Sequence, residues 1–179
     1  QNDEFLDFWY SDFLTEDFWQ IIFVLGKKHL KVLSEFIKEP YSDTYAKSTI
    51  STALSQWVLH FPELRSVAIN WYKDIFEFFI SEKKLSRLPD EDLVGFMVCD
   101  VIDFNGIELE QEIVKLYNLE LTYPGMAGPL EEVIEDLRMV RSDSKREIEK
   151  NIFERYFDAL TSWQYYNEDE DDEDEVWDG

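Results

Sequence analysis

Five side chains that carry oxygen ligands cluster around one turn of the sequence: Asp100, Asp103, Asn105, Glu108 and Glu110. Ca²⁺ and Mg²⁺ prefer carboxylate and amide oxygens as ligands. The stretch Asp103-Phe-Asn105-Gly106 partly follows a calcium loop but departs from its 12-residue ligand pattern ending in Glu. Asp and Asn also form ordinary turns. We therefore favour a turn, and keep as an alternative a metal-dependent enzyme that uses Asp100, Asp103, Asn105 and Glu108.

A second group of acids lies near the start of the chain, at Asp7, Asp12, Glu16 and Asp17. As a site, these carboxylates would bind a cation or a basic peptide. Thr15 followed by two acids is also typical of a helix start, where a hydroxyl caps the helix and acids favour its positive end. Helix capping is the interpretation that we favour.

The remaining residues with catalytic potential do not form a recognisable arrangement. The two histidines, His29 and His60, each lie near an expected helix end, where an imidazole can pair with a carbonyl or the helix dipole. The single cysteine, Cys99, lies in an apolar run, which indicates a buried thiol in a reducing compartment such as the cytoplasm. One cysteine forms no intrachain disulfide. We expect no enzymatic activity and no cofactor.

The elements that position these residues are all expected to be helices, because apolar residues recur at steps of three and four. The expected helices cover residues 3–10, 16–25, 28–39, 43–61, 62–79, 89–103 and 107–118, one begins at Pro129, and another begins at a capping box of Ser144 and Glu147. Residues 119–129 form the one long loop, a connector with a functional role as the alternative. Trp57, Trp71, Tyr72, Phe76 and Phe79 are expected to form one buried seam.

Part of the helical pattern is repeated. Phe18, Ile21, Ile22 and Val24 align with Leu93, Phe96, Met97 and Cys99 at an offset of 75, and Leu33, Phe36 and Ile37 align with Ile113, Leu116 and Tyr117 at an offset of 80. One further helix pair fits between the copies, so the unit has roughly 38–40 residues, the size of a two-helix solenoid repeat. The prediction is an all-α, right-handed superhelix of HEAT-like antiparallel helix pairs, with about eight helices over residues 1–166.

Composition and charge restrict the classes of partner. Hydrophobic residues make up 45% of the 179 residues and the net charge is −23, with nine acids between positions 168 and 178. Residues 167–179 are therefore expected to be an acidic, disordered tail. Nucleic acid binding requires clustered Lys or Arg, so we expect none. No stretch has the roughly 18 apolar residues that span a bilayer, so no membrane segment is expected.

Several segments resemble a bacterial family of helical-repeat proteins of unknown function, some of which carry a C-terminal SEC-C zinc motif. The similarity covers Asp3–Val140 and depends on residues 12–17, 26–37 and 43–46, with Ser11 in place of the family's glycine in Gly-Asp-x-x-Thr-Glu-Asp. The resemblance implies an α-α superhelix of the armadillo type, with further repeats upstream of Gln1. It implies no catalytic residues. The zinc motif is absent, because one cysteine cannot build it.

The helix that begins near Glu16 is apolar on nearly all sides and must be covered. Upstream repeats, a partner protein or a second copy of the chain would supply that cover. Candidate interaction residues are Trp9, Asp12, Glu16, Asp17, Trp19 and Phe23. The function that we expect is a cytoplasmic, non-enzymatic protein-interaction scaffold that uses the concave surface of the repeats. A second alternative, besides the metal-dependent enzyme, is an acidic mimic that sequesters a basic protein.

Overall fold

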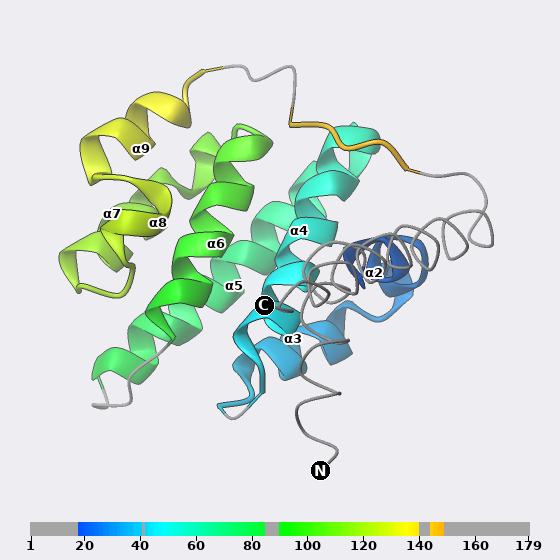
Figure 1. Cartoon of the computed structure of the whole chain (residues 1–179), viewed down its shortest axis with the longest axis horizontal. Helices are drawn as coiled ribbons and strands as arrows, with labels where there is room; N and C mark the ends of the chain where they lie inside the picture. Colours follow the sequence, from blue (N-terminus) through cyan, green and yellow to red (C-terminus); the bar gives the residue numbers. More distant parts are fainter. Residues whose placement is uncertain (1–17, 41, 85–89, 140–143, 149–179) are drawn as a thin grey trace, which may run out of the picture. The chain divides into compact units, whose positions relative to one another are not determined.

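The structure is a computed structural model that describes residues 18–40, 42–84, 90–139 and 144–148. These residues contain eight α-helices and no strands (Figure 1), which confirms the all-α prediction for this part of the chain. The chain divides into two compact units, residues 1–146 and residues 147–179. Every contact described below lies within the first unit. None of its described helices combines the length and the apolar character needed to cross a membrane.

The helices follow the predicted order. They are α2 (Phe18–Leu25), α3 (Leu30–Lys38), α4 (Thr44–His60), α5 (Arg65–Lys84), α6 (Glu91–Asp103), α7 (Glu110–Asn118), α8 (Pro124–Ala127) and α9 (Leu130–Asp136). Short 3-10 turns precede three of them: η2 (Gly26–Lys28), η3 (Pro62–Leu64) and η4 (Ile107–Leu109). Pro62 occupies the first turn of η3, where its missing N–H leaves no hydrogen bond unmade. The chain therefore folds back directly from α4 into α5.

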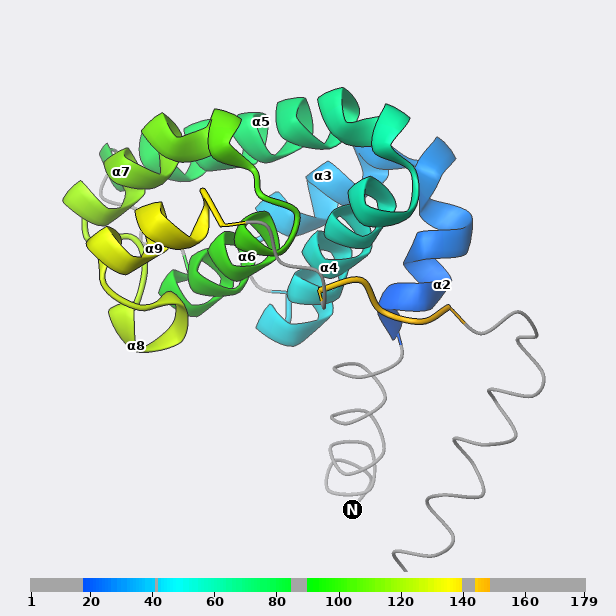
Figure 2. The same cartoon turned by 90° about the horizontal axis from the view of Figure 1, so that it is seen from above.

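Successive helices pack in two layers within this unit. Helix α4 packs between α2 and α6, and α6 also contacts α8. Helix α5 packs between α3 and α7, and α7 contacts α9. Figure 2 shows α3, α5 and α7 on one side, and α2, α4 and α6 on the other. Even-numbered and odd-numbered helices thus form separate layers, so each connection crosses from one layer to the other.

The core lies between these layers. The predicted aromatic seam is confirmed, because Trp57, Trp71, Tyr72, Phe76 and Phe79 are all buried. Helix α4 is buried on almost every side, and its N–H groups at the start are capped by Asp43, which accepts a hydrogen bond of 2.9 Å from the Ala46 N–H. A helix covered all round must bury polar positions as well as apolar ones. On α4 these are Lys47, Thr49, Ser51, Ser55 and Gln56.

The turn between α6 and η4 forms as predicted at Asn105-Gly106. Asn105 has a φ of 54°, a left-handed conformation that Asn tolerates better than most residues. At the other end of α6, Asp90 is the N-cap and accepts hydrogen bonds of 3.1 Å from the N–H groups of Asp92 and Leu93. Pro89, the expected first residue of this helix, lies outside the described residues.

Two local expectations are wrong. Residues 119–129 are not only a loop, because α8 forms at Pro124–Ala127 and packs on α6. The close approach requires Gly95, since an added Cβ would lie 2.9 Å from Met126 Cβ. Residues 144–148 are not helical, so the capping box of Ser144 and Glu147 does not start a helix there. Ser144 and Arg146 of this segment instead form hydrogen bonds with side chains of α4 and α6.

Candidate functional site

The site with the most unusual chemistry lies where residues 144–146 cross α4. We call residues 144–146 the strap. In Figures 1 and 2 the strap runs as an extended segment beside α4. It is bound by side chains from α2, α4 and α6, which are far apart in the sequence. The site is therefore a product of the helix packing.

Gln56 on α4 binds the strap backbone at two points. Its Nε2 donates to the Ser144 carbonyl oxygen at 2.9 Å, and its Oε1 accepts from the Arg146 N–H at 2.9 Å. Gln56 is fully buried, so both hydrogen bonds are shielded from water. A residue of a neighbouring parallel β-strand makes the same pair of bonds, to the carbonyl of one residue and to the N–H two positions later. The Gln56 side chain thus replaces a β-strand partner.

The strap is also held at Arg146 by two rings. His60 Nε2 lies 3.0 Å from the Arg146 carbonyl oxygen, and the Arg146 guanidinium lies over the Trp19 ring at 5.4 Å. Partial burial lowers the pKa of His60, more than the Arg146 carbonyl raises it. The imidazole is therefore neutral at pH 7, and its Nε2–H donates to the carbonyl. This confirms that His60 pairs with a carbonyl near a helix end.

The opposite wall of the site consists of carboxylates on α6. Ser144 Oγ donates to Asp103 Oδ1 at 3.1 Å. One turn earlier, Asp100 is 6% exposed, and its Oδ2 accepts a long hydrogen bond of 3.4 Å from Thr52 Oγ1. The positive charge of Arg146 favours the ionised form of Asp100. The strap thus brings a basic residue to the acidic side of α6.

Burial dominates the chemistry of Asp100 and of its neighbour Tyr72. Loss of hydration raises the pKa of Asp100 to about 7, although the Ser51 hydroxyl, Arg146 and Thr52 act in the other direction. Burial also raises the pKa of Tyr72 well above its usual value. The Tyr72 hydroxyl therefore stays protonated and donates to the Ser51 carbonyl at 2.8 Å. Ser51 and Tyr72 are fully enclosed, so a substrate could not reach their hydroxyls without opening of the core.

The four metal candidates predicted from the sequence have separate partners. Glu108 accepts two hydrogen bonds of 2.8 Å from Arg65, Asn105 donates to the Met139 carbonyl, Asp103 binds Ser144, and Asp100 is enclosed. The part of the chain that the structure describes contains no group of three His, Cys, Asp or Glu residues that could hold a metal ion. The structure does not bring these four together as a ligand set.

Two of the six predicted interaction residues are described, and both are covered within the chain. Trp19 is 2% exposed and Phe23 is 5% exposed. The Phe23 ring lies 5.3 Å from the His60 ring and 5.8 Å from the Phe61 ring. Trp9, Asp12, Glu16 and Asp17 lie outside the described residues. Trp19 contributes to the site in a different way from the prediction, because it forms the floor under Arg146.

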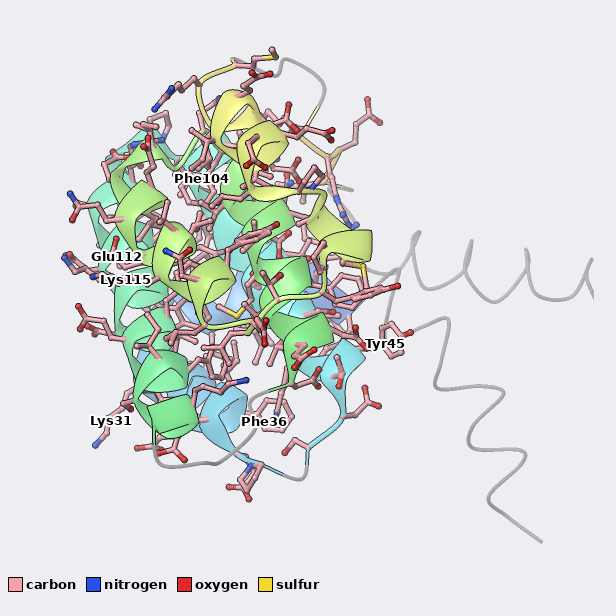
Figure 3. The ribbon with its side chains drawn as sticks, turned by 90° about the vertical axis from the view of Figure 1, so that its left-hand side faces the viewer. Lys31, Phe36, Tyr45, Phe104, Glu112 and Lys115 are labelled. Atoms are coloured by element: carbon pink, nitrogen blue, oxygen red, sulfur yellow. The ribbon has the colours of Figure 1, made fainter. Side chains whose placement is uncertain are left out.

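Apolar side chains do reach the surface nearby. Val24 and Leu25 at the end of α2 are 60% and 66% exposed, and Val32 on α3 is 59% exposed. Figure 3 shows Phe36 of α3 and Tyr45 of α4 at the surface, with exposures of 40% and 51%. Cys99 is half-buried, not fully buried, and its Sγ lies 3.7 Å from the Met126 carbonyl oxygen.

A separate hollow of about 380 Å³ adjoins the α7–α8 connection, and part of its lining comes from the predicted loop. Its lining combines one lysine, two glutamates and two tyrosines with Thr122 and Pro124. Tyr117, in this lining, donates to the Gly128 carbonyl at 2.8 Å, and burial raises its pKa to about 12. The mixed charges of this lining favour no particular ligand. The lining residues are Lys83, Glu91, Tyr117, Glu120, Thr122, Tyr123 and Pro124.

Sequence reasoning missed Gln56, Ser51 and the strap. A signal was present in residues 51–56, where Ser51, Thr52, Ser55 and Gln56 form a polar stripe along one side of the helix. Such a stripe fits a solvated face equally well. Only the packing of α2 and α6 against α4 shows that it is buried.

In comparisons with known proteins, no family model, no curated protein and no solved structure matches this chain. The function is therefore argued from the site alone.

Proposed function

We propose that this chain is a non-enzymatic protein-interaction scaffold that binds an extended segment of a partner protein alongside α4. In this proposal the two helix layers belong to a right-handed, HEAT-like superhelix, and the protein works in a reducing compartment such as the cytoplasm. The single observation that carries the proposal is the pair of 2.9 Å hydrogen bonds between the Gln56 amide and a backbone segment. Amide recognition of backbone groups is independent of sequence and suits an extended peptide.

Three properties of the surroundings support this interpretation. Gln56 is fully buried, so its hydrogen bonds gain strength from the low local dielectric. Trp19 offers an aromatic face for an arginine. Asp103, together with Asp100, whose pKa is about 7, places acidic groups on one side of the site, which favours segments with basic residues. In such a site a peptide is bound by hydrogen bonds to its backbone, by a cation–π contact with an aromatic ring and by attraction between opposite charges.

A peptide-display selection on the full chain tests this function. Random peptides are selected for binding to the wild-type protein and then tested against Gln56→Ala and Gln111→Ala. Gln111 is the matched control, because it is an exposed glutamine on α7. We expect the selected peptides to bind the Gln111 variant normally and the Gln56 variant about tenfold more weakly, since two hydrogen bonds are lost. Peptides that bind both variants equally, or a selection without enrichment, would overturn the proposal.

The two alternatives predict other outcomes. A metal-dependent enzyme at Asp100, Asp103, Asn105 and Glu108 predicts a melting point that rises with Ca²⁺, Mg²⁺, Mn²⁺ or Zn²⁺ concentration. An acidic mimic predicts binding that falls steeply with salt and on deletion of residues 167–179. The scaffold proposal predicts instead that peptide binding is weakened mainly by replacement of Gln56.

A further inference from the structure

We infer that the strap is an internal substitute for the partner segment, and that this segment carries a serine or threonine two positions before an arginine. The inference rests on the proposed function and specifies its partner. Its first support is conformational. Ser144 and Glu147 have the spacing of a capping box, yet residues 144–148 are not helical. The hydroxyl of Ser144 donates to Asp103, and its carbonyl accepts from Gln56.

The second support is the register of the contacts. Gln56 binds the carbonyl of the first strap residue and the N–H of the third, so the backbone positions are fixed relative to α4. The first side chain, Ser144, then meets Asp103 at 3.1 Å, and the third, Arg146, lies over Trp19. Lys145 and Arg146 are both exposed, but it is the Arg146 guanidinium that lies over the Trp19 ring. The site therefore selects positions one and three and leaves position two free.

The third support is charge. The strap contains two adjacent basic residues, Lys145 and Arg146, in a chain of net charge −23. Arg146 interacts favourably with Asp100, and Ser144 donates a hydrogen bond to Asp103. A carboxylate accepts from a small hydroxyl donor at position one, and a guanidinium matches the indole face at position three. Both preferences point to the same short, basic class of peptide.

An internal segment competes with a partner because its effective concentration is high. For short tethers this concentration is in the millimolar range. The apparent affinity for an external peptide is then the intrinsic affinity multiplied by the fraction of chains in which the strap is released. Weakening the strap should therefore strengthen binding of an external peptide, provided that both use Gln56.

The test uses a fluorescent peptide with the sequence of residues 142–150 and measures its anisotropy on four full-length proteins. These are the wild type, Arg146→Ala, Arg146→Ala with Gln56→Ala, and Lys145→Ala. We expect Arg146→Ala to bind the peptide about tenfold more tightly than the wild type, because its own strap is weakened. Adding Gln56→Ala should reverse this gain. Lys145→Ala removes the same charge from the neighbouring residue, which does not lie over Trp19, and should behave like the wild type.

A second arm changes the peptide and leaves the protein unchanged, so it does not depend on the folding of a variant. Replacing the peptide's arginine, or the serine two positions before it, should weaken binding to Arg146→Ala by about tenfold, whereas replacing the intervening lysine should have little effect. Equal binding of all these peptides, or equal binding by the wild type and Arg146→Ala, would overturn the inference. If display-selected peptides still require Gln56 in that case, the proposed function stands without it. If they do not, both fail.

Discussion

The helix pairs α2–α3 and α6–α7 have aligned sequences, but two aligned positions differ sharply in exposure. At an offset of 75, Leu25 aligns with Asp100; the leucine is 66% exposed and the aspartate 6%. At an offset of 80, Phe36 aligns with Leu116; the phenylalanine is 40% exposed (Figure 3) and the leucine is fully buried. Leu25 and Asp100 thus reverse the usual rule that apolar side chains are buried and acids are exposed, and Phe36 departs from it.

The neighbours of each pair explain the reversal. Helix α6 packs between α4 and α8, and α7 contacts both α5 and α9. Among the described residues, α2 packs mainly on α4, and α3 on α5 and α4. A side chain of a stacked helix is covered by the next helix pair, whatever its own polarity. At these two positions the neighbouring helices, and not the residue type, decide burial.

The largest expected effect comes from truncating the aligned pair Phe36 and Leu116. Leu116→Ala should lower the free energy of unfolding by about 2–5 kcal/mol, because it leaves a cavity in a fully buried position. Phe36→Ala should cost less than about 1 kcal/mol despite the larger side chain removed, because its ring already contacts solvent. Urea denaturation of both variants measures the difference. Similar losses in the two variants would mean that Phe36 is covered in solution.

The second effect concerns Asp100, the buried acid of the aligned pair Leu25 and Asp100. Its pKa is about 7 in the folded state against an ordinary value of 3.8, so the folded protein binds the extra proton between these values. The Asp100 contribution therefore lowers stability as pH rises from about 4 to 7 and stays unfavourable above 7. Asp100→Asn removes this contribution. It should stabilise the protein at pH 8 by on the order of 2 kcal/mol, with little change near pH 4.

The measurement is the unfolding free energy of both proteins from pH 4 to pH 8. Asp74→Asn is the control, because Asp74 is exposed on α5 and carries the same change of charge. The difference between Asp100→Asn and the wild type should grow with pH, and the Asp74 difference should not. A constant difference for Asp100→Asn would show that the carboxyl is ionised throughout this range.

The sequence predicts correctly those features that depend on local spacing and on residue type. The periodicity of apolar residues predicts every described helix of more than four residues, and the buried aromatic seam from Trp57 to Phe79. These features depend on local spacing and on the side chains themselves. The α4–α5 turn at Pro62 and the α6–η4 turn at Asn105 were likewise predictable from residue types with a special backbone preference.

The site could not be predicted, because it is assembled by packing. Gln56 is a candidate ligand for backbone only once α4 is enclosed by α2 and α6. Ser144 is a good helix cap by its spacing, but Asp103 and Gln56 bind its polar groups first. Helix α8 forms where Gly95 allows Met126 to approach. Each of these outcomes depends on a partner that is distant in the sequence, which a local pattern cannot identify.

The third prediction tests how α2, the less covered helix, is attached to α4. Trp57 Nε1 donates to the Phe23 carbonyl oxygen at 2.8 Å, in a buried position. Trp57→Phe should cost about 1–2 kcal/mol, because a buried carbonyl loses its donor. Trp71→Phe is the matched control, since Trp71 Nε1 is buried without a hydrogen-bond partner among the described residues. That change should cost less, because no hydrogen bond is lost. Equal losses in thermal denaturation would assign both effects to packing alone.

The smallest expected effects concern the two connecting turns, which are stabilised by different cations. At the α6–α7 turn, Arg65 binds Glu108 through two nitrogens and donates to the carbonyls of Phe104 and Asn105. At the α2–α3 turn, Lys27 lies over the Phe61 ring at 3.4 Å without this fork of hydrogen bonds.

Arg65→Lys should cost about 1 kcal/mol, because an ammonium cannot bind all these acceptors in one plane. Lys27→Met should cost about 0.5 kcal/mol, since the cation–π contacts with Phe61 and Phe23 and the attraction to Glu63 are lost. Guanidinium chloride weakens ion pairs by screening, so urea is the denaturant for this comparison. A larger loss for Lys27→Met would mean that the α2–α3 turn is the more firmly held of the two.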